Sequence, residues 1–306
     1  MRAALLMAAA AGLILASCRS VDAPAAQERP AALATFASPD AAFASLVDAA
    51  RTGSVDGFEP LLGPEAASLI GAEDGVALRS ELEAFVEGYD LAHRIDAADG
   101  DRATLVLGEE DWPFPIPLVR TGDGWTFDVE EGAEEIVSRR IGRNELSAIE
   151  VCRAIGDAQE EYRARFGRYA ARLLSSEEEQ DGLYWPTGEG EAPSPLGELV
   201  AAAAPEGPAP AGNGAPAPYL GYRYRILVER GGSAPGGAGS YLAGGALKEG
   251  YVVLAWPAEY GSLGIMTFLM DRRGVVLERD LGERTDEIAS GFASYDPTLE
   301  WEVCGD

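Results

Sequence analysis

Apolar residues recur every three or four positions early in the chain and predict helices at residues 41–50 and 78–89, with another helix between them after a break at Gly53. Ser38 and Pro39 come just before the first of them and are residue types preferred at an N-cap and at the first helical position. Further on, apolar and polar positions alternate, which is typical of strands with one exposed face. Three strands are predicted there, at residues 103–107, 116–120 and 125–129.

In the second half, apolar residues again advance by threes and fours from residue 144 to residue 174 and predict a long helix with one buried face. Proline, glycine and alanine dominate residues 187–218, which indicates an irregular excursion. The remaining pattern favours strands, and a glycine suited to a hairpin turn lies between the last two. These strands are predicted at residues 222–228, 251–256, 265–270 and 275–279.

The order of these elements predicts an α+β fold in two domains. Residues 38–137 are expected to form helices followed by an antiparallel meander, and residues 138–306 a long helix packed on an antiparallel sheet. The first arrangement resembles the NTF2-like fold in the order of its elements rather than in a motif.

The second domain resembles the globular domain of type IV pilins and type II pseudopilins. The resemblance rests on four runs: EYRARFGRYA (161–170), GYRY (221–224), AWP (255–257) and GIMTF (264–268). In pilins an apolar helix half precedes this domain and assembles the filament, whereas here an entire domain precedes the helix. The resemblance therefore implies the globular fold alone.

The N-terminus combines Arg2 with an uncharged apolar stretch that is too short to span a bilayer. The stretch ends in LASC (15–18), which resembles the lipobox of bacterial lipoproteins. The resemblance implies that residues 1–17 are a signal peptide and that the lipidated Cys18 is the first mature residue. An ordinary signal peptide with an incidental cysteine is the alternative.

Residues 18–37 are rich in alanine and proline and are expected to form a flexible tether. A lipid on Cys18 would make the anchor the protein's only membrane contact. Arg19 stands where an aspartate would, by resemblance, favour inner-membrane retention. A periplasmic protein anchored in the outer membrane of a Gram-negative cell is therefore expected.

Acidic side chains outnumber basic ones, with 51 Asp and Glu against 24 Lys and Arg and a formal net charge of −27. This charge argues against nucleic acid as a partner, because a polyanion requires a clustered basic surface. Lys248 is the only lysine and no glycine-rich phosphate loop is present, so a lysine Schiff base or a P-loop is not expected. No cofactor is predicted.

Besides Cys18, the chain contains Cys152 and Cys304. Export permits a disulfide between them, which would tie the C-terminal tail to the long helix. The alternative is that Cys152 is a buried apolar residue and that Cys304 lies in a frayed end. With only His93 in addition, these residues lack the ligand spacing of a zinc site, and no metal is predicted.

Arg139, Arg140 and Arg143 form a local positive cluster at the junction of the two predicted domains. One hypothesis is that their guanidinium groups clamp a carboxylate or a phosphate. The other is an ion-pair hinge with the glutamates at residues 130–135.

Three aromatic-proline segments are candidate contact surfaces, and they contain Trp112, Trp185, Trp256 and Tyr260. Such side chains either face a partner or seal a core. Carboxylates are too abundant for a catalytic pair to be chosen from spacing, and a solvated acidic face accounts for the run 109–111.

The whole chain is similar to a family of bacterial envelope proteins, domain of unknown function family 2950. The similarity rests on DWPFPIP (111–117), GAEEI (132–136), RRIGRNEL (139–146), DGLYWP (181–186) and WPAEYG (256–261). The family resemblance implies no activity.

Two functions remain open. The first is a non-catalytic binding or envelope-assembly module that contacts an envelope protein or a small ligand through the arginine cluster and the aromatic-proline loops. The alternative is a hydrolase or isomerase with its site in the N-terminal cone, lined by Trp112, Tyr89 and acidic residues.

Overall fold

We describe a computed structural model of the 306-residue chain. The described residues are 33–70, 75–97, 100–122, 124–176, 179–188, 190–196, 218–298 and 300–305. The predicted signal peptide and Cys18 lie outside them. The structure is 35% helical and 26% strand, which confirms the α+β class.

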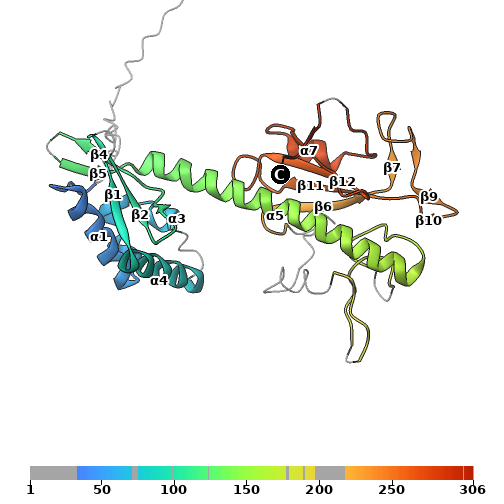
Figure 1. The fold of residues 1–306 in the computed structure, drawn as a ribbon, viewed down its shortest axis with the longest axis horizontal. Helices are drawn as coiled ribbons and strands as arrows, with labels where there is room; N and C mark the ends of the chain where they lie inside the picture. Colours follow the sequence, from blue (N-terminus) through green and yellow to red (C-terminus); the bar gives the residue numbers. More distant parts are fainter. Residues whose placement is uncertain are drawn as a thin grey trace, which may run out of the picture.

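The N-terminal part, here called the N-lobe, consists of short helices and one antiparallel sheet (Figure 1). Its helical elements are α1 (Pro39–Thr52), η1 (Val55–Gly57), α2 (Glu59–Leu62), α3 (Ala66–Leu69) and α4 (Gly75–Leu91). Its strands are β1 (His93–Asp96), β2 (Arg102–Leu107), β3 (Trp112–Pro113), β4 (Leu118–Thr121) and β5 (Gly124–Phe127). The strand order is β1-β2-β4-β5, with β3 paired to β2.

Helix α1 begins as the sequence predicts. The hydroxyl of Ser38 accepts a hydrogen bond from the N–H of Ala41 (3.2 Å), and Gly53 ends the helix in the left-handed conformation. The buried face of α1 lies on the sheet, where the rings of Phe43 and Phe127 meet edge to face at 5.8 Å. The N-lobe therefore has its own apolar core between α1 and the strands.

Helix α5 (Val129–Phe166) differs from the predicted helix 144–174 at both ends. The carboxylate of Asp128 caps its start by accepting a hydrogen bond from the N–H of Glu131 (3.2 Å). Gly167, in the left-handed conformation, ends it. The predicted domain boundary between residues 137 and 138 thus lies inside one continuous helix.

The C-terminal part, the C-lobe, places α5 across an antiparallel sheet of order β14-β13-β12-β11-β6. The sheet strands are β6 (Tyr222–Leu227), β11 (Val252–Pro257), β12 (Met266–Asp271), β13 (Val276–Asp280) and β14 (Glu302–Val303). Peripheral elements are β7 (Glu229–Arg230), β8 (Gly239–Ser240), β9 (Leu242–Ala243), β10 (Ala246–Leu247) and α7 (Thr285–Ser290).

The interior strand β11, between β12 and β6, is buried along its whole length. Helix α5 contacts this strand, and so does α7, which lies on the other side of the sheet in Figure 1. Because both faces of β11 are covered, its sequence is a continuous apolar run rather than an alternation.

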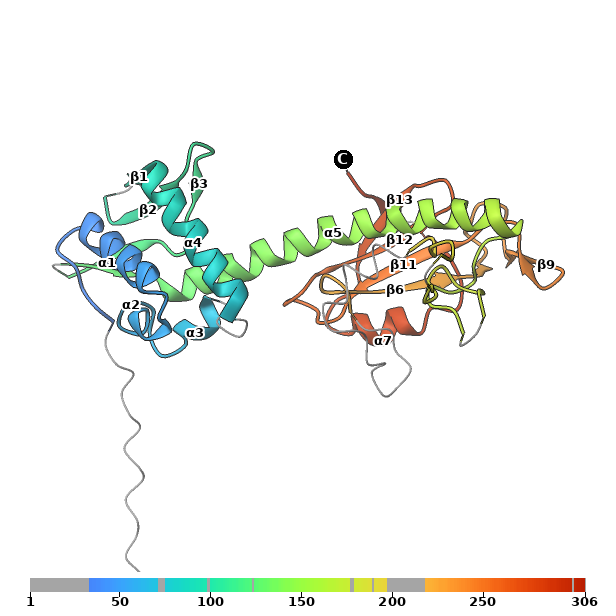
Figure 2. The same cartoon turned by 90° about the horizontal axis from the view of Figure 1, so that it is seen from below.

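The two lobes contact opposite faces of α5 at opposite ends of the helix (Figures 1 and 2). Gly132 and Ile136 face the N-lobe, where they lie against its core. Ala148, Cys152 and Ile155 face the C-lobe, where they are part of a second, separate core. Gly132 and Ala148 are sixteen positions apart, about 160° around the helix at about 100° per residue.

Candidate functional site

Arg139 is fixed against the N-lobe. Its Nε donates a hydrogen bond to Oε1 of Glu135 (2.8 Å), and its Nη1 donates to the carbonyl oxygen of Pro113 (2.7 Å). The guanidinium also lies over the ring of Trp112, at 5.2 Å from the ring centre. Arg139 therefore joins α5 to strand β3, in agreement with the ion-pair hinge hypothesis for this residue.

The other two arginines of the predicted cluster have different surroundings. Arg140 donates from Nε to the carbonyl oxygen of Ser262 in the C-lobe (3.2 Å). Arg143 is exposed and has no hydrogen-bond or ion-pair partner among the described residues. Successive residues of a helix diverge by about 100°, so neighbours in the sequence face different ways. The three arginines consequently do not form a single anion-binding fork, and two of them each hold one lobe.

The loop after β11 is held by the next turn of α5. The side-chain amide of Asn144 donates to the carbonyl oxygen of Leu263 (2.8 Å). The carboxylate of Glu145 accepts hydrogen bonds from the N–H groups of Ile265 (2.9 Å) and Met266 (3.0 Å). The C-lobe is therefore fastened to the helix immediately beyond the lobe junction.

An open apolar groove lies on α5 between the two lobes. Ala133, Val137 and Ile141 form its floor at spacings of four, and Ile265 of the C-lobe closes one end. The groove has a volume of about 490 Å³, with Glu134 and Ser138 along its border. We call Ala133, Val137, Ile141 and Ile265 the junction stripe. It continues the face of α5 that is buried in the C-lobe, but its members are only half-buried.

Two of the aromatic residues predicted as contact residues are core residues instead. Trp185 and Trp256 are 6% and 3% exposed, and both belong to the C-lobe core. The indole N–H of Trp256 donates to Oδ1 of Asp286 in α7 (2.8 Å), which satisfies its polar atom. Burial thus removes both side chains from any surface that a partner would meet.

Trp112 and Tyr260 are more accessible. Trp112 is 46% exposed and lies edge-on to Phe114, with ring centres 6.4 Å apart. Tyr260 is half-buried, and its hydroxyl donates to Oδ2 of Asp280 (3.2 Å). Burial, followed by this carboxylate, raises the pKa of Tyr260. Trp112 is therefore the predicted aromatic contact that lies at the lobe junction and on the surface.

Cys152 and Cys304 both contact the C-lobe core. Cys152 is fully buried, and Cys304 is partly buried against the same core in the tail that follows β14. The two sulfurs are not joined by a disulfide bond in this structure. Burial raises the pKa of Cys152 to about 12. Since the thiolate is the species that reacts, burial also opposes oxidation of Cys152.

We expect iodoacetamide at about pH 8 to label Cys304 and to spare Cys152 in the native protein, because only Cys304 is accessible and Cys152 stays protonated. Peptide mass spectrometry measures the labelling at each position. In denaturant both positions should react, which serves as the control. If both cysteines resist labelling in denaturant until a reductant is added, a disulfide joins them.

The N-lobe sheet, where the catalytic alternative places its site, packs against an apolar core. Its interior is filled by Phe43, Leu105, Leu118 and Phe127, each at most 2% exposed. Hydrogen bonds from Arg102 lower the pKa of Glu131, which is opposite to the shift of a general acid.

The acidic run beside β3 is exposed. Glu109, Glu110 and Asp111 all face solvent, and Asp111 pairs with Arg94 at 3.2 Å. The ring of Tyr89 stacks on that of His93, with ring centres 3.7 Å apart. The exposure of the three carboxylates and the ion pair with Arg94 fit the predicted solvated acidic face.

In the described part of the chain, no cluster of three or more His, Cys, Asp or Glu is placed to bind a metal ion. No helix there has the length and apolarity needed to cross a membrane.

Sequence reasoning missed the junction stripe. Ala133, Val137 and Ile141 are spaced by four, which is the spacing of one helical face, but glutamates and arginines surround them in the sequence. The signal would have been visible only with the knowledge that the helix begins at Val129.

A family model described as "Protein of unknown function (DUF2950)" matches residues 34–304, which include both lobes and α5. No curated protein matches the chain, and no solved structure matches it. Because the family model covers nearly the whole chain, the protein belongs to the DUF2950 family.

Proposed function

We propose that this protein is a lipid-anchored periplasmic protein that acts as a non-catalytic binding or envelope-assembly module, in which the junction stripe binds an envelope protein. The observation that carries the proposal is the stripe itself. Its members continue a helix face that is buried in the C-lobe, yet between the lobes they are only half-buried and line an open groove. Apolar surface left open in this way is typical of a protein-binding site.

The surroundings of the stripe support binding. Hydrogen bonds from Arg139 and Arg140 hold one lobe each on α5, so the groove between the lobes has defined walls. A preformed groove binds a partner at a lower entropic cost than a surface that has to be ordered. The exposed Trp112 at the same junction supplies an aromatic contact of the kind that dominates many interfaces.

The location and the fold relationships belong to the same proposal. The lipobox resemblance at Cys18 supports an outer-membrane anchor, with the tether 18–37 giving the lobes reach. A helix lying across an antiparallel sheet supports a pilin-like C-lobe, and helices followed by a meander support an NTF2-like N-lobe.

The test is affinity capture from an envelope extract with the lipidated full chain and with Ile141→Glu. A charge in the centre of the stripe should remove the bound partner, because burying an unpaired carboxylate is costly. The loss should be at least about tenfold by quantitative mass spectrometry.

Leu146→Glu is the matched control. Leu146 is 68% exposed on the same helix, but it lies on the face opposite the stripe. It should capture the same partners as the unmodified chain. Equal capture by all three proteins would refute a role for the junction stripe.

A further inference from the structure

Three cations lie together at the end of the C-lobe that is farthest from the N-lobe. The N–H of Tyr169 donates to the carbonyl oxygen of Leu247 (2.8 Å) in an antiparallel bridge, which brings Arg168 opposite Lys248. Arg272 lies beside the same segment, because a methyl group placed on Gly250 would lie 3.1 Å from its Cδ. We call Arg168, Lys248 and Arg272 the distal basic cluster.

All three members of the cluster are exposed, and none forms an ion pair with a described residue. The neighbouring carboxylates are already occupied by other arginines. These ion pairs are Arg163–Glu160, Arg165–Glu161, Arg230–Glu249 and Arg273–Asp271. The positive charge of the distal basic cluster is therefore not neutralised locally.

The cluster also affects a buried phenol. Burial and the Glu160 carboxylate, which accepts a hydrogen bond from the Tyr169 hydroxyl (2.9 Å), raise the pKa of Tyr169. The guanidinium groups of Arg163 and Arg272 oppose that rise.

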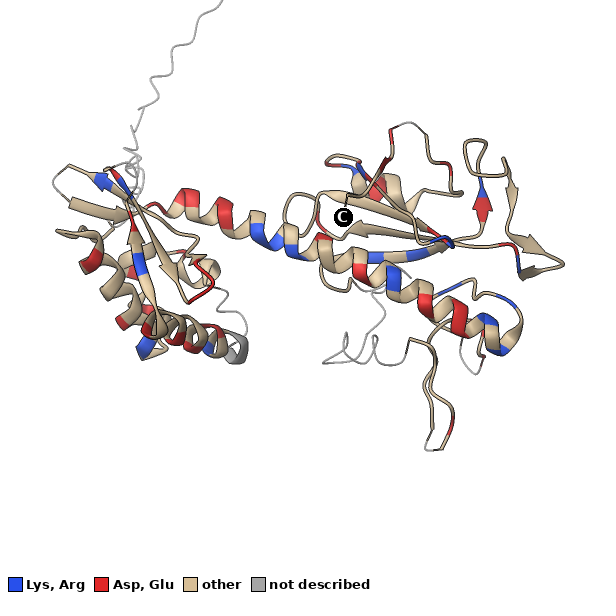
Figure 3. Ribbon diagram, viewed as in Figure 1, with Lys and Arg blue, Asp and Glu red and all other residues tan. Residues whose placement is uncertain are grey.

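Basic residues gather where α5 ends and in the adjacent loops (Figure 3). Exposed apolar side chains accompany them, since Leu242 and Phe166 are 40% and 39% exposed.

The N-lobe has the opposite character. Residues 33–137 contain 23 Asp and Glu against five Arg. An open groove of about 580 Å³ lies between α1 and α4, with Leu82, Val86 and Leu91 as its apolar floor. Leu91 is 66% exposed.

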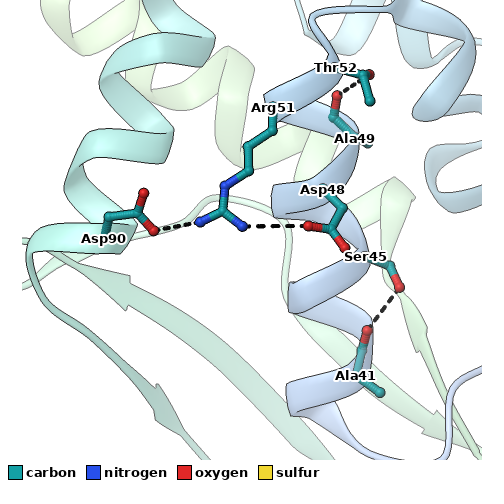
Figure 4. Close-up of polar contacts among 7 residues, drawn as sticks. All are labelled: Ala41, Ser45, Asp48, Ala49, Arg51, Thr52 and Asp90. Carbon is teal, nitrogen blue, oxygen red and sulfur yellow. Dashed lines mark hydrogen bonds and ion pairs between the residues drawn. The ribbon is translucent and has the colours of Figure 1, made fainter.

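Acidic residues form the rim of this groove. Glu83 and Glu87 are exposed on α4 and have no ion-pair partner among the described residues. Arg51 of α1 bridges Asp90 (2.6 Å) and Asp48 (3.5 Å), as Figure 4 shows. Arg51 thus forms ion pairs with two carboxylates. Because one positive charge faces two negative ones, the rim of the groove keeps an excess of negative charge.

We propose that the distal basic cluster of one molecule docks on the α1–α4 groove of a second copy of this chain. The two surfaces are complementary in charge, and each carries exposed apolar side chains. They cannot meet within one molecule, because they lie at opposite ends of the 38-residue helix α5, which is about 57 Å long. Since the two surfaces differ, the contact is head-to-tail and repeats from copy to copy.

This interaction is independent of the junction stripe, so either proposal can fail without the other. Sedimentation velocity of the purified full chain measures it at about 0.02 M and about 0.5 M salt. Association should appear at low salt and weaken at least about tenfold at high salt, because it rests on opposite charges.

Charge reversal identifies the surfaces. Arg168→Glu/Lys248→Glu should weaken association at least about tenfold. The control Arg120→Glu/Arg143→Glu changes the net charge equally, at exposed arginines that have no ion-pair partner among the described residues, and should stay within about twofold of the unmodified chain.

A complementary pair makes the test specific. Glu83→Arg/Glu87→Arg should also fail to associate alone, because both of its surfaces are then basic. Mixed with Arg168→Glu/Lys248→Glu, it should associate again at 1:1 stoichiometry with the two variants alternating, since each contact between unlike variants joins a basic surface to an acidic one. A monomer at every salt concentration, or equal effects of the cluster and control variants, would overturn the proposal. So would binding of the unmodified chain to anionic phospholipid vesicles through the cluster without self-association.

Discussion

Trp256→Ala should lower the free energy of unfolding by about 3–5 kcal/mol, as expected for removal of a large buried aromatic side chain. The indole lies on the interior strand β11 and is 3% exposed. Its loss leaves a cavity in the C-lobe core and removes the hydrogen bond to Asp286. Urea unfolding followed by circular dichroism measures the change.

Trp112→Ala is the matched control, because it removes the same side chain from a surface position. Trp112 is 46% exposed, and its interaction with Arg139 at 5.2 Å is of the exposed cation–π kind. The expected loss is less than about 1 kcal/mol. Similar losses for the two variants would contradict the assignment of Trp256 to the core and of Trp112 to the surface.

Gly132→Ala should destabilise the protein by up to about 2 kcal/mol, although alanine is the better helix former by about 1 kcal/mol. A methyl group on Gly132 would lie 2.7 Å from Cγ1 and 2.8 Å from Cγ2 of Ile116. Ile116 is 2% exposed and β-branched, so it cannot rotate away. The overlap has to be relieved by moving α5 away from the N-lobe, which costs about 1–3 kcal/mol.

Gly142→Ala in the same helix should instead stabilise the protein. A methyl group there would meet no atom within 4 Å, so the helix gains about 0.5–1 kcal/mol from the higher propensity of alanine. Thermal unfolding of the two variants side by side measures both effects. If Gly132→Ala also stabilises the protein, the close contact between α5 and Ile116 is not formed.

Local patterns in the sequence were sufficient for α1, α4 and seven of the strands, which are β2, β4, β5, β6, β11, β12 and β13. Ser38 predicted the start of α1, and a hydroxyl that caps an N–H three residues ahead acts within one turn of chain. The apolar run of β11 and its neighbours predicted the strands of the C-lobe sheet. These signals depend on neighbours within a few residues, and the sequence therefore contains them in full.

The start of α5 was misplaced because charged residues surround the apolar positions of its first turns. The segment contains Gly132 and Gly142 and many charges, which are weak helix signals. The segment is helical because Asp128 caps its start and because Gly132 packs against Ile116. Ile116 lies in the connection between β3 and β4. Such a contact exists only after the sheet has formed.

The candidate sites show the same division. The arginine cluster was predicted because its members are close together in the sequence. On the helix they point in different directions, and Arg139 and Arg140 form hydrogen bonds with different lobes. The junction stripe and the distal basic cluster join residues from distant segments. The junction stripe depends on which elements cover α5. The distal basic cluster depends on the two segments that pair at Tyr169 and Leu247.

The sequence by itself determined the α+β class, the acidic character and the family of this protein. The helix and strand periods, the charge and the sequence runs are all properties of residues close together in the chain. Only the tertiary structure decided that Trp256 is core and Trp112 is surface, and that two lobes share one helix on opposite faces. Burial is decided by packing between distant segments, because an apolar side chain is covered only where another element lies against it.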